Sequence, residues 1–347
     1  MAKQVVLCTH SLDNNQLIAD VMAAVRARGA TPLRFDTDRF PIEVPVSILQ
    51  DEQDSAITVG NGTERITIGA EDVIWYRRAY WGGKLPRTME RQQLQVCIAE
   101  SEATLRGLMA SFPGFVLDPP ERVRLCDHKL RQLRMAKELG MATPRTLVTN
   151  DPVAAQQFIA SCPRGAVAKM LTGFAIYDDQ KAGQQAERKD DNMKQERVVF
   201  TSSLTPELLK KLDGLRYCPM VFQEKIEKRL ELRITVIGAR MFAAAVDSQA
   251  MAGAEIDWRQ KGAKLVESWT SYTLPKELEA QLGEYMARIG MQYSAIDVIV
   301  EPSGRHVFLE ANPGGEFVWL ESCSPHFPLV AALADALTDQ PGARRVP

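Results

Sequence analysis

Residues 294–319 read as a β-hairpin with its acidic residues in register, and this pattern constrains the chain more than any other. Two apolar strands flank a Pro-Ser-Gly turn, and a pair of glycines follows the second strand. Because side chains alternate between the faces of a strand, Glu310 and Asn312 point the same way, and the hairpin can bring Asp297 alongside them. Three hard oxygen donors in one place suit Mg²⁺. An ordinary hairpin with acids on its solvated face explains the same residues, so the hairpin alone leaves both interpretations open.

Size and charge bound the class of protein. A chain of 347 residues is too long for one simple core, which predicts two or three domains. Apolar residues make up 45% of the chain and charged residues 25%, as in ordinary globular proteins. The formal net charge of -2 gives no sign of a nucleic-acid-binding surface, and no apolar run reaches transmembrane length. We therefore expect neither a nucleic acid nor a membrane as a partner.

The cysteines and the N-terminus bear on the cellular compartment. The six cysteines are scattered without a CxxC pair or a Cys/His cluster, which disfavours both a zinc site and a disulfide framework. The chain starts directly with a strand-forming segment and not with a signal peptide. These features predict reduced thiols in a cytoplasmic protein.

The first 120 residues predict a parallel sheet. A strand at 4–8, a helix at 13–28 and a strand at 32–36 form a βαβ opening. No GxGxxG follows the first strand, which disfavours a dinucleotide-binding domain. Further strands are expected at 46–49, 56–59, 64–68 and 72–81, followed by a helix at 90–111.

The rest of the chain predicts two α+β units. Helices are expected at 124–139, 151–161, 275–289 and 328–337, and strands after Pro144 and at 166–171. Three adjacent antiparallel strands are expected at 221–226, 231–238 and 240–248, the last two turning at Gly238. The strongly polar stretch at 178–197 reads either as a surface insertion or as a lid.

Two lysines extend the interpretation of the acidic hairpin. Lys169 lies inside the apolar strand AVAKM, where a buried ammonium needs an anionic partner. Lys129 lies on a helix from which it could reach the same cleft. Each lysine alone is explained as well by a side chain that reaches solvent. Together with the hairpin, however, two cations and a divalent-metal site are what a nucleoside triphosphate needs.

The common phosphate-binding motifs are missing, since neither GxxxxGK[ST] nor the HRD and DFG motifs of kinases occur. A triphosphate must therefore be held by another scaffold. The order of a helix with Lys129, a strand with Lys169, the segment QEKIEKRLELR and a final D…E-x-N set resembles the ATP-grasp ligases. The resemblance covers residues 121–335 and implies a nucleotide between two α+β subdomains.

The resemblance also implies a role for each matching residue. The implied ATP site comprises Lys129, Lys169, Gln223, Glu224, Lys225, Ile226, Glu231, Arg233 and Asn312. The implied Mg²⁺ ligands are Asp297, Glu310 and Asn312. In this assignment the two lysines contact phosphates, Glu231 takes the place of the ribose-binding acid, and Arg233 points towards phosphate at the reaction centre.

A narrower resemblance spans nearly the whole chain. The segments VIWYRRAYW, VFQEKIEKRLELRITVIGARMFAAAVDSQ, IDWR and FLEANPGGEFVWLE are similar to the ligases that macrocyclise microviridins and related graspetides. Those ligases activate a Glu or Asp side-chain carboxylate of a ribosomally made precursor peptide, with leader and core, as an acyl phosphate. A Thr or Ser hydroxyl, or a Lys amine, of the same peptide then displaces phosphate and closes a lactone or lactam.

The resemblance implies an α/β chain with the α+β ATP-grasp fold. A pre-ATP-grasp domain with a parallel sheet is expected at 1–120, a central subdomain at 121–220 and a C-terminal subdomain with the Mg²⁺ site at 221–347. For the N-terminal domain, dimerisation and peptide docking are the two alternative roles. Arg77 and Arg78 are expected to brace this domain against the nucleotide cleft.

Asp257 and Arg259 flank Trp258 in a charged segment that could be a surface loop with salt bridges. In the resembling ligases this Asp-x-Arg element lies at the reaction centre. There the arginine could bind the acceptor carboxylate with two hydrogen bonds, and the aspartate could help to deprotonate the incoming hydroxyl. We therefore expect Asp257 and Arg259, with Arg233, to be catalytic.

The sequence departs from the resembling ligases at Glu316-Phe317, where a Gln-Trp pair is the usual expectation. The sequence thus predicts a cytoplasmic ligase that uses ATP and Mg²⁺ to crosslink the side chains of a ribosomal peptide. Two alternatives stay open. One is a ligase of the same fold that adds an amino acid to a protein or peptide terminus, and the other is a non-catalytic regulator that binds a nucleotide or a peptide.

Overall fold

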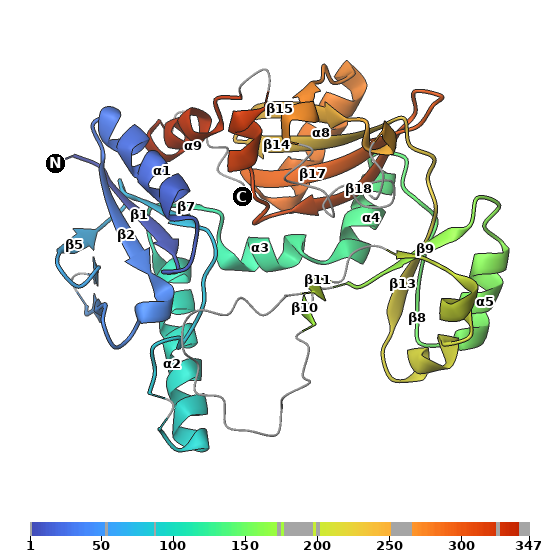
Figure 1. Cartoon of the computed structure of the whole chain (residues 1–347). Helices are drawn as coiled ribbons and strands as arrows, with labels where there is room; N and C mark the ends of the chain where they lie inside the picture. Colours follow the sequence, from blue (N-terminus) through green and yellow to red (C-terminus); the bar gives the residue numbers. More distant parts are fainter. Residues whose placement is uncertain are drawn as a thin grey trace.

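The computed structural model describes residues 2–52, 55–86, 88–171, 175–176, 197–198, 202–250, 266–323 and 327–339. The N-terminal sheet lies beside a larger C-terminal sheet, and a smaller central sheet lies at the opposite end of the molecule (Figure 1). The predicted polar stretch at 178–197 lies outside the described residues except for Arg197. No helix in the described ranges is both long enough and apolar enough to cross a membrane.

The N-terminal sheet is parallel throughout, which confirms the βαβ prediction. Its order is β2-β1-β6-β7, formed by β1 (Gln4–Thr9), β2 (Thr31–Asp36), β6 (Val73–Tyr76) and β7 (Phe115–Leu117). Successive residues of each strand face opposite sides of the sheet and so enter different hydrophobic cores. Val5 and Val73 lie in the core that includes α1 (Asn15–Ala27), whereas Val6 and Ile74 lie in the core that includes α2 (Arg91–Ser111). The two helices therefore cover opposite faces of the sheet.

A small antiparallel sheet follows β2 along the chain. It consists of β3 (Val46–Gln50), β4 (Ser55–Gly60) and β5 (Arg65–Ile68), in that order. These strands occupy the positions expected for the three short strands. Their buried residues join the core beneath α2.

The single helix predicted at 124–139 is wrong, because two helices occupy this segment. They are α3 (Pro120–Cys126) and α4 (Lys129–Glu138). Pro120 sits in the first turn of α3, where its fixed φ favours helix initiation. His128 leaves the helical region with ψ of 89°, so the chain turns and the second helix starts at Lys129. The break matters because it places Lys129 at a helix start.

The central sheet is antiparallel, with the order β12-β9-β13-β8. Its strands are β8 (Thr146–Thr149), β9 (Ala166–Lys169), β12 (Ser202–Ser203) and β13 (Met220–Glu224). Helix α5 (Pro152–Ala160) covers it, and the Asp151 side chain caps this helix by accepting from the Val153 N–H. The predicted pairing of residues 221–226 with 231–238 is wrong. Phe222 of β13 is buried with Ala155 and Ala168, which fixes β13 in the central sheet.

The C-terminal sheet carries the acidic hairpin. Its order is β16-β15-β14-β17-β18, with β14 (Leu230–Ile237), β15 (Arg240–Val246), β16 (Thr270–Ser271), β17 (Tyr293–Val300) and β18 (His306–Asn312). Strands β14 and β15 turn at Gly238, which has φ of +59°. Helix α8 (Lys276–Ile289) packs on one face through Leu282 and Tyr285. The other face carries the polar residues of the site, and beside them Ile237 and Ala244 enter the core that includes the last helix of the chain.

The last helix, α9 (Leu329–Thr338), packs against α1 and so joins the two ends of the chain. Asp335 of α9 forms ion pairs with Arg28 and Arg240. Short elements complete the described structure. They are β10 (Ala175–Ile176), β11 (Arg197–Val198), α6 (Pro206–Leu209) and 3₁₀ turns at Thr37–Arg39, Leu212–Arg216, Ser248–Ala250, Val266–Ser268 and Val318–Ser322.

Candidate active site

The hairpin β17–β18 brings the predicted metal ligands together. Asp297 lies directly opposite Glu310 in the antiparallel register, and a bulge follows between Asp297 and Val298. Asn312 donates from Nδ2 to Asp297 Oδ2 at 3.2 Å. The opposite face of both strands is buried under α8 by Ile296 and Ala311, so the acids share the face that α8 leaves open. This confirms the predicted register of the hairpin.

Strand β14 places a cation and a second acid on the same face. Arg233 lies opposite Asp297, and its Nη1 is 3.0 Å from Asp297 Oδ1. The Arg233 side chain is only 9% exposed, and its Nη2 also donates to the Glu316 carbonyl. Two residues earlier, Glu231 pairs with Lys228 Nζ at 3.0 Å. Burial raises the pKa of Glu231 above its ordinary value, and the neighbouring Lys228 opposes this rise.

Helix α4 adds a cation from another element. Lys129 is its first residue, and Lys129 Nζ lies 2.9 Å from Glu310 Oε2. A cation at a helix N-terminus opposes the helix dipole, so helix stability does not explain this placement. The lysine instead provides positive charge beside the acids.

One turn further along α4, Gln132 fixes the helix to β18. Its Oε1 accepts from the Ala311 N–H at 2.9 Å, and its Nε2 donates to the Ala311 carbonyl at 2.8 Å. Gln132 is buried and also donates to the Cys126 carbonyl. Because Ala311 lies between Glu310 and Asn312, Gln132 sets the position of both predicted ligands relative to Lys129. The sequence carries no signal for this role, since a buried glutamine on a helix has no motif.

The donor set fits Mg²⁺. Within the described ranges, no three His, Cys, Asp or Glu side chains gather closely enough to hold a metal ion. Asp297 and Glu310 supply two carboxylates, and Asn312 supplies an amide oxygen. Mg²⁺ is commonly held by one or two carboxylates, with phosphates and water completing its shell. These three residues are therefore the ones that could hold it.

The other predicted nucleotide residues lie on the central sheet. Lys169 ends β9, and Gln223 on β13 is buried and donates to Thr146 Oγ1 at 3.0 Å. The N–H of Glu224 donates to the Arg145 carbonyl, and that of Lys225 donates to the Gly165 carbonyl. Because both N–H groups are already used within the protein, a backbone hydrogen bond from either residue to the adenine base of ATP would have to be accepted by the residue's carbonyl oxygen. Ile226 follows in the segment that leads to β14.

The predicted catalytic residues Asp257 and Arg259 lie outside the described residues. Of the predicted catalytic set, the structure places Arg233 alone. Their roles stay predictions.

A cavity of about 640 Å³ opens beside the acidic cluster. The N-terminal domain, the α3–α4 segment and the C-terminal domain all contribute to its wall. It is lined by Tyr76, Arg77, Arg78, Ala79, Val123, Asp127, Arg233, Asn312, Pro313, Gly314, Gly315, Glu316 and Trp319. The arginines of the N-terminal domain follow the carboxyl end of β6, the end at which parallel α/β sheets usually bind ligands.

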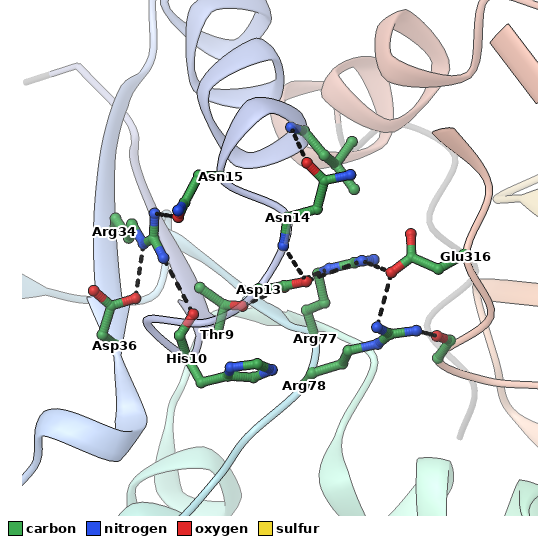
Figure 2. Close-up of polar contacts among 12 residues, drawn as sticks. Thr9, His10, Asp13, Asn14, Asn15, Arg34, Asp36, Arg77, Arg78 and Glu316 are labelled. Atoms are coloured by element: carbon green, nitrogen blue, oxygen red, sulfur yellow. Dashed lines mark hydrogen bonds and ion pairs between the residues drawn. The ribbon is translucent and has the colours of Figure 1, made fainter. Parts of the chain in front are cut away.

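Arg77 and Arg78 tie the N-terminal domain to the loop after β18 (Figure 2). Arg77 Nε is 2.7 Å from Asp13 Oδ2, and Arg77 Nη2 is 2.7 Å from Glu316 Oε1. Arg78 Nη1 reaches the same Glu316 oxygen at 2.8 Å, and its Nη2 donates to the Gly314 carbonyl. The arginines therefore brace the N-terminal domain against the site, as expected from the sequence.

Burial alone would raise the pKa of Asp13. Hydrogen bonds from Arg77 and Thr9 outweigh burial and lower the pKa to about 2. Asp13 is therefore a permanent counter-charge for Arg77. Sequence reasoning missed this residue, because it lies far from Arg77 in the chain and meets it only when β1 and β6 pair side by side.

The fold and this cluster define an ATP-grasp ligase, and comparison with known proteins supports this. The family model described as the MvdD pre-ATP grasp domain matches residues 4–124. The macrocyclase MdnC from Microcystis aeruginosa MRC, crystallised with its precursor peptide MdnA, is 40% identical with a TM-score of 0.81. That match covers 96% of this chain and 99% of MdnC. No curated protein sequence matches the chain significantly.

Two further solved structures agree. A RiPP-associated ATP-grasp ligase from Chryseobacterium gregarium, in complex with ADP and with leader and core peptides, is 33% identical with a TM-score of 0.89. That match covers 99% of both chains. Macrocyclase MdnB from the same Microcystis strain is 33% identical with a TM-score of 0.77, and the match covers 97% of this chain and 99% of MdnB. The chain therefore belongs to the family of ATP-grasp macrocyclases and RiPP-associated ligases.

Proposed function

We propose that the protein is an ATP- and Mg²⁺-dependent peptide macrocyclase. It phosphorylates a Glu or Asp side chain of a ribosomally made precursor peptide and joins it to a Thr or Ser hydroxyl, or to a Lys amine, of the same peptide. The observation that carries this proposal is the cluster of Lys129, Glu310, Asp297 and Arg233 at the edge of a large cavity lined by further arginines. The cluster suits a triphosphate with its metal, and the cavity leaves room for a second substrate.

The first step transfers a phosphoryl group. A carboxylate oxygen of the peptide attacks the γ-phosphorus of ATP, ADP leaves, and the peptide carries an acyl phosphate. Lys129 and Lys169 bind the phosphates and Arg233 offsets the negative charge of the transferred group. Asp297, Glu310 and Asn312 would hold Mg²⁺, which would neutralise part of the negative charge of the triphosphate.

The second step closes the ring. The peptide hydroxyl or amine attacks the acyl carbon, loses its proton and displaces inorganic phosphate. Asp257 takes this proton and Arg259 binds the acceptor carboxylate beforehand. No nucleophilic side chain of the enzyme is required, because the acyl phosphate already provides the activation. The enzyme contributes orientation and charge.

The precursor peptide is the partner favoured by the relatives, since MdnC is bound with a precursor peptide and the Chryseobacterium ligase holds a leader and a core peptide. We place the protein in the cytoplasm, with neither a nucleic acid nor a membrane as a partner. A homodimer through the N-terminal domain stays a prediction.

The expected three-domain division at 1–120, 121–220 and 221–347 also stays a proposal. Strand β13 (Met220–Glu224) spans the expected boundary between residues 220 and 221, so we propose that the central subdomain extends through Glu224. Each subdomain then keeps a complete sheet.

The test combines purified protein, ATP, Mg²⁺ and the peptide encoded beside its gene, and mass spectrometry reads the peptide. Each ring removes the mass of one water, and the loss requires ATP. A gain equal to an amino-acid residue would favour the terminal ligase instead. ATP hydrolysis with unmodified peptide would favour the non-catalytic regulator. Asp297→Asn serves as the control, because it removes the negative charge of one predicted metal ligand and keeps the shape of the side chain.

A further inference from the structure

Three guanidinium groups line the cavity beside the acidic cluster, and they differ in how they are neutralised. Arg77 is 3% exposed and has Asp13 as a buried partner. Arg233 is 9% exposed and has Asp297. Arg78 is 42% exposed, and the carboxylate beside it is that of Glu316, which Arg77 shares. Arg78 is thus the cation in this cavity that lies most open to an incoming ligand.

Glu316 holds Arg78 through a single oxygen. Both arginines contact Oε1, at 2.7 and 2.8 Å. Glu316 Oε2 is buried and has no hydrogen-bond partner in the described part of the chain. A guanidinium fork binds a carboxylate best with two parallel hydrogen bonds, and a buried oxygen without a partner is costly. The Arg78–Glu316 contact therefore falls short of what an ideally placed carboxylate could form.

The position of Arg78 in the fold favours contact with the peptide substrate over contact with the nucleotide. It follows β6 of the N-terminal domain, whereas the predicted phosphate residues lie on β9, α4 and β14. It shares the cavity wall with Arg233 and Asn312 of the acidic cluster. A carboxylate that enters this cavity can therefore meet Arg78 from the wall that the N-terminal domain provides.

We propose that Arg78 binds a carboxylate side chain of the acidic substrate peptide, and that Glu316 is an internal competitor for the same guanidinium. Glu316 thereby sets how strongly the enzyme selects acidic peptides. This inference rests on the proposed function for the identity of the ligand.

The test is a double-mutant cycle on peptide binding. The probe is the precursor peptide encoded beside the gene, labelled with a fluorophore, and anisotropy without ATP gives its Kd. Glu316→Gln keeps an acceptor oxygen for both arginines and removes the competing charge. It lowers the Kd by about threefold to tenfold, whereas Arg78→Gln raises it by a similar factor. The double variant matches Arg78→Gln, because the remaining partner of Glu316, Arg77, is buried and is not open to the peptide.

Two controls make the result specific. A peptide with its core Asp and Glu residues changed to Asn and Gln loses the response to Glu316→Gln. All three variants keep a cooperative thermal unfolding transition and still bind ATP, which excludes a general loss of structure even where loss of the Arg77–Glu316 and Arg78–Glu316 ion pairs lowers the melting temperature. A Glu316→Gln gain that persists in the Arg78→Gln background, or no change in Kd, overturns the proposal.

Binding and ring formation are measured separately, so the two proposals fail in distinguishable ways. Ring formation without the predicted cycle contradicts the role of Arg78 and leaves the macrocyclase standing. The predicted cycle without any ring contradicts the macrocyclase and leaves the carboxylate site standing. A peptide that does not bind at all overturns both.

Discussion

Lys129 Nζ lies 2.9 Å from Glu310 Oε2, across the contact between α4 and β18. Glu310 is nearly buried, so its charge needs a partner. Lys129 supplies that charge from the start of a helix, where the helix dipole disfavours a cation. A lysine placed against the helix dipole and beside a predicted metal ligand is better explained by binding of phosphate than by stability of the helix.

Lys129→Met should raise the KM for ATP by about tenfold to a hundredfold, the worth of a charge-assisted hydrogen bond. The KM of Lys129→Arg should lie between that of the unaltered protein and that of Lys129→Met, because arginine keeps the charge in a different geometry. Lys137→Met is the matched control, since Lys137 is exposed on the same helix. Steady-state ADP release measures all three. An unchanged KM in Lys129→Met would remove the lysine from the nucleotide site.

Gln132→Leu should weaken Mg²⁺ activation by about tenfold, because it leaves the Ala311 N–H and carbonyl without partners and loosens Glu310 and Asn312. Cys126→Ala is the matched control. Its buried thiol lies 3.8 Å from the Ala311 carbonyl, so the change lowers the melting temperature but keeps the hydrogen bonds between Gln132 and Ala311. Titration of activity with Mg²⁺ separates the two. Equal shifts of the Mg²⁺ dependence in both variants would show that Gln132 acts only through packing.

Gly315→Ala should abolish activity, whereas Gly314→Ala should keep the dependence on Mg²⁺ and ATP. A Cβ on Gly315 would lie 2.5 Å from Ala295 Cβ and 2.7 Å from Arg233 Nη2, which forces Arg233 away from Asp297. A Cβ on Gly314 meets no atom within 4 Å. Calorimetric ATP binding and turnover report the outcome. Equal tolerance at both positions would show that the backbone approach at Gly315 is not required.

The stability of the protein should depend on pH through Asp118. Burial raises the pKa of Asp118 to about 7, although the N–H groups of Gln292 and Tyr293 donate to it and oppose the rise. Because its pKa is raised in the folded state, Asp118 contributes stability that is present below about pH 4 and is lost as the pH rises through about 7. The melting temperature should therefore decline from pH 5 to pH 8 through this group.

Asp118→Asn should flatten that decline, since the side chain no longer titrates. Asp72→Asn is the matched control, because Asp72 also accepts from two backbone N–H groups but is less buried. Thermal melts across the pH range measure both variants. A slope that survives in Asp118→Asn would assign the pH dependence to other groups.

The sequence was sufficient where a feature depends on local pattern. The hairpin and the shared face of its acids were expected from two apolar strands around a strong turn, and the structure has both, but Asp297 lies opposite Glu310 because a bulge between Asp297 and Val298 shifts the register. The parallel N-terminal sheet follows from the βαβ opening in the same way.

Features that depend on tertiary contacts were not predictable. The break at His128 and the pairing of β13 with β8 and β9 are decided by packing between distant segments. The buried glutamine at 132 has no motif, because its partners are the backbone atoms of a strand far along the chain. The contact of Glu316 with Arg77 and Arg78 exists only once the two ends of the chain meet.

The most direct test of the account follows the oxygen atoms of the peptide. The precursor is prepared with oxygen-18 in its Glu and Asp carboxylates and incubated with the enzyme, ATP and Mg²⁺. Activation as an acyl phosphate predicts that each ring releases one inorganic phosphate carrying one labelled oxygen. Rings formed with unlabelled phosphate, or labelled AMP in place of labelled phosphate, would contradict the transfer of the γ-phosphoryl group to the peptide.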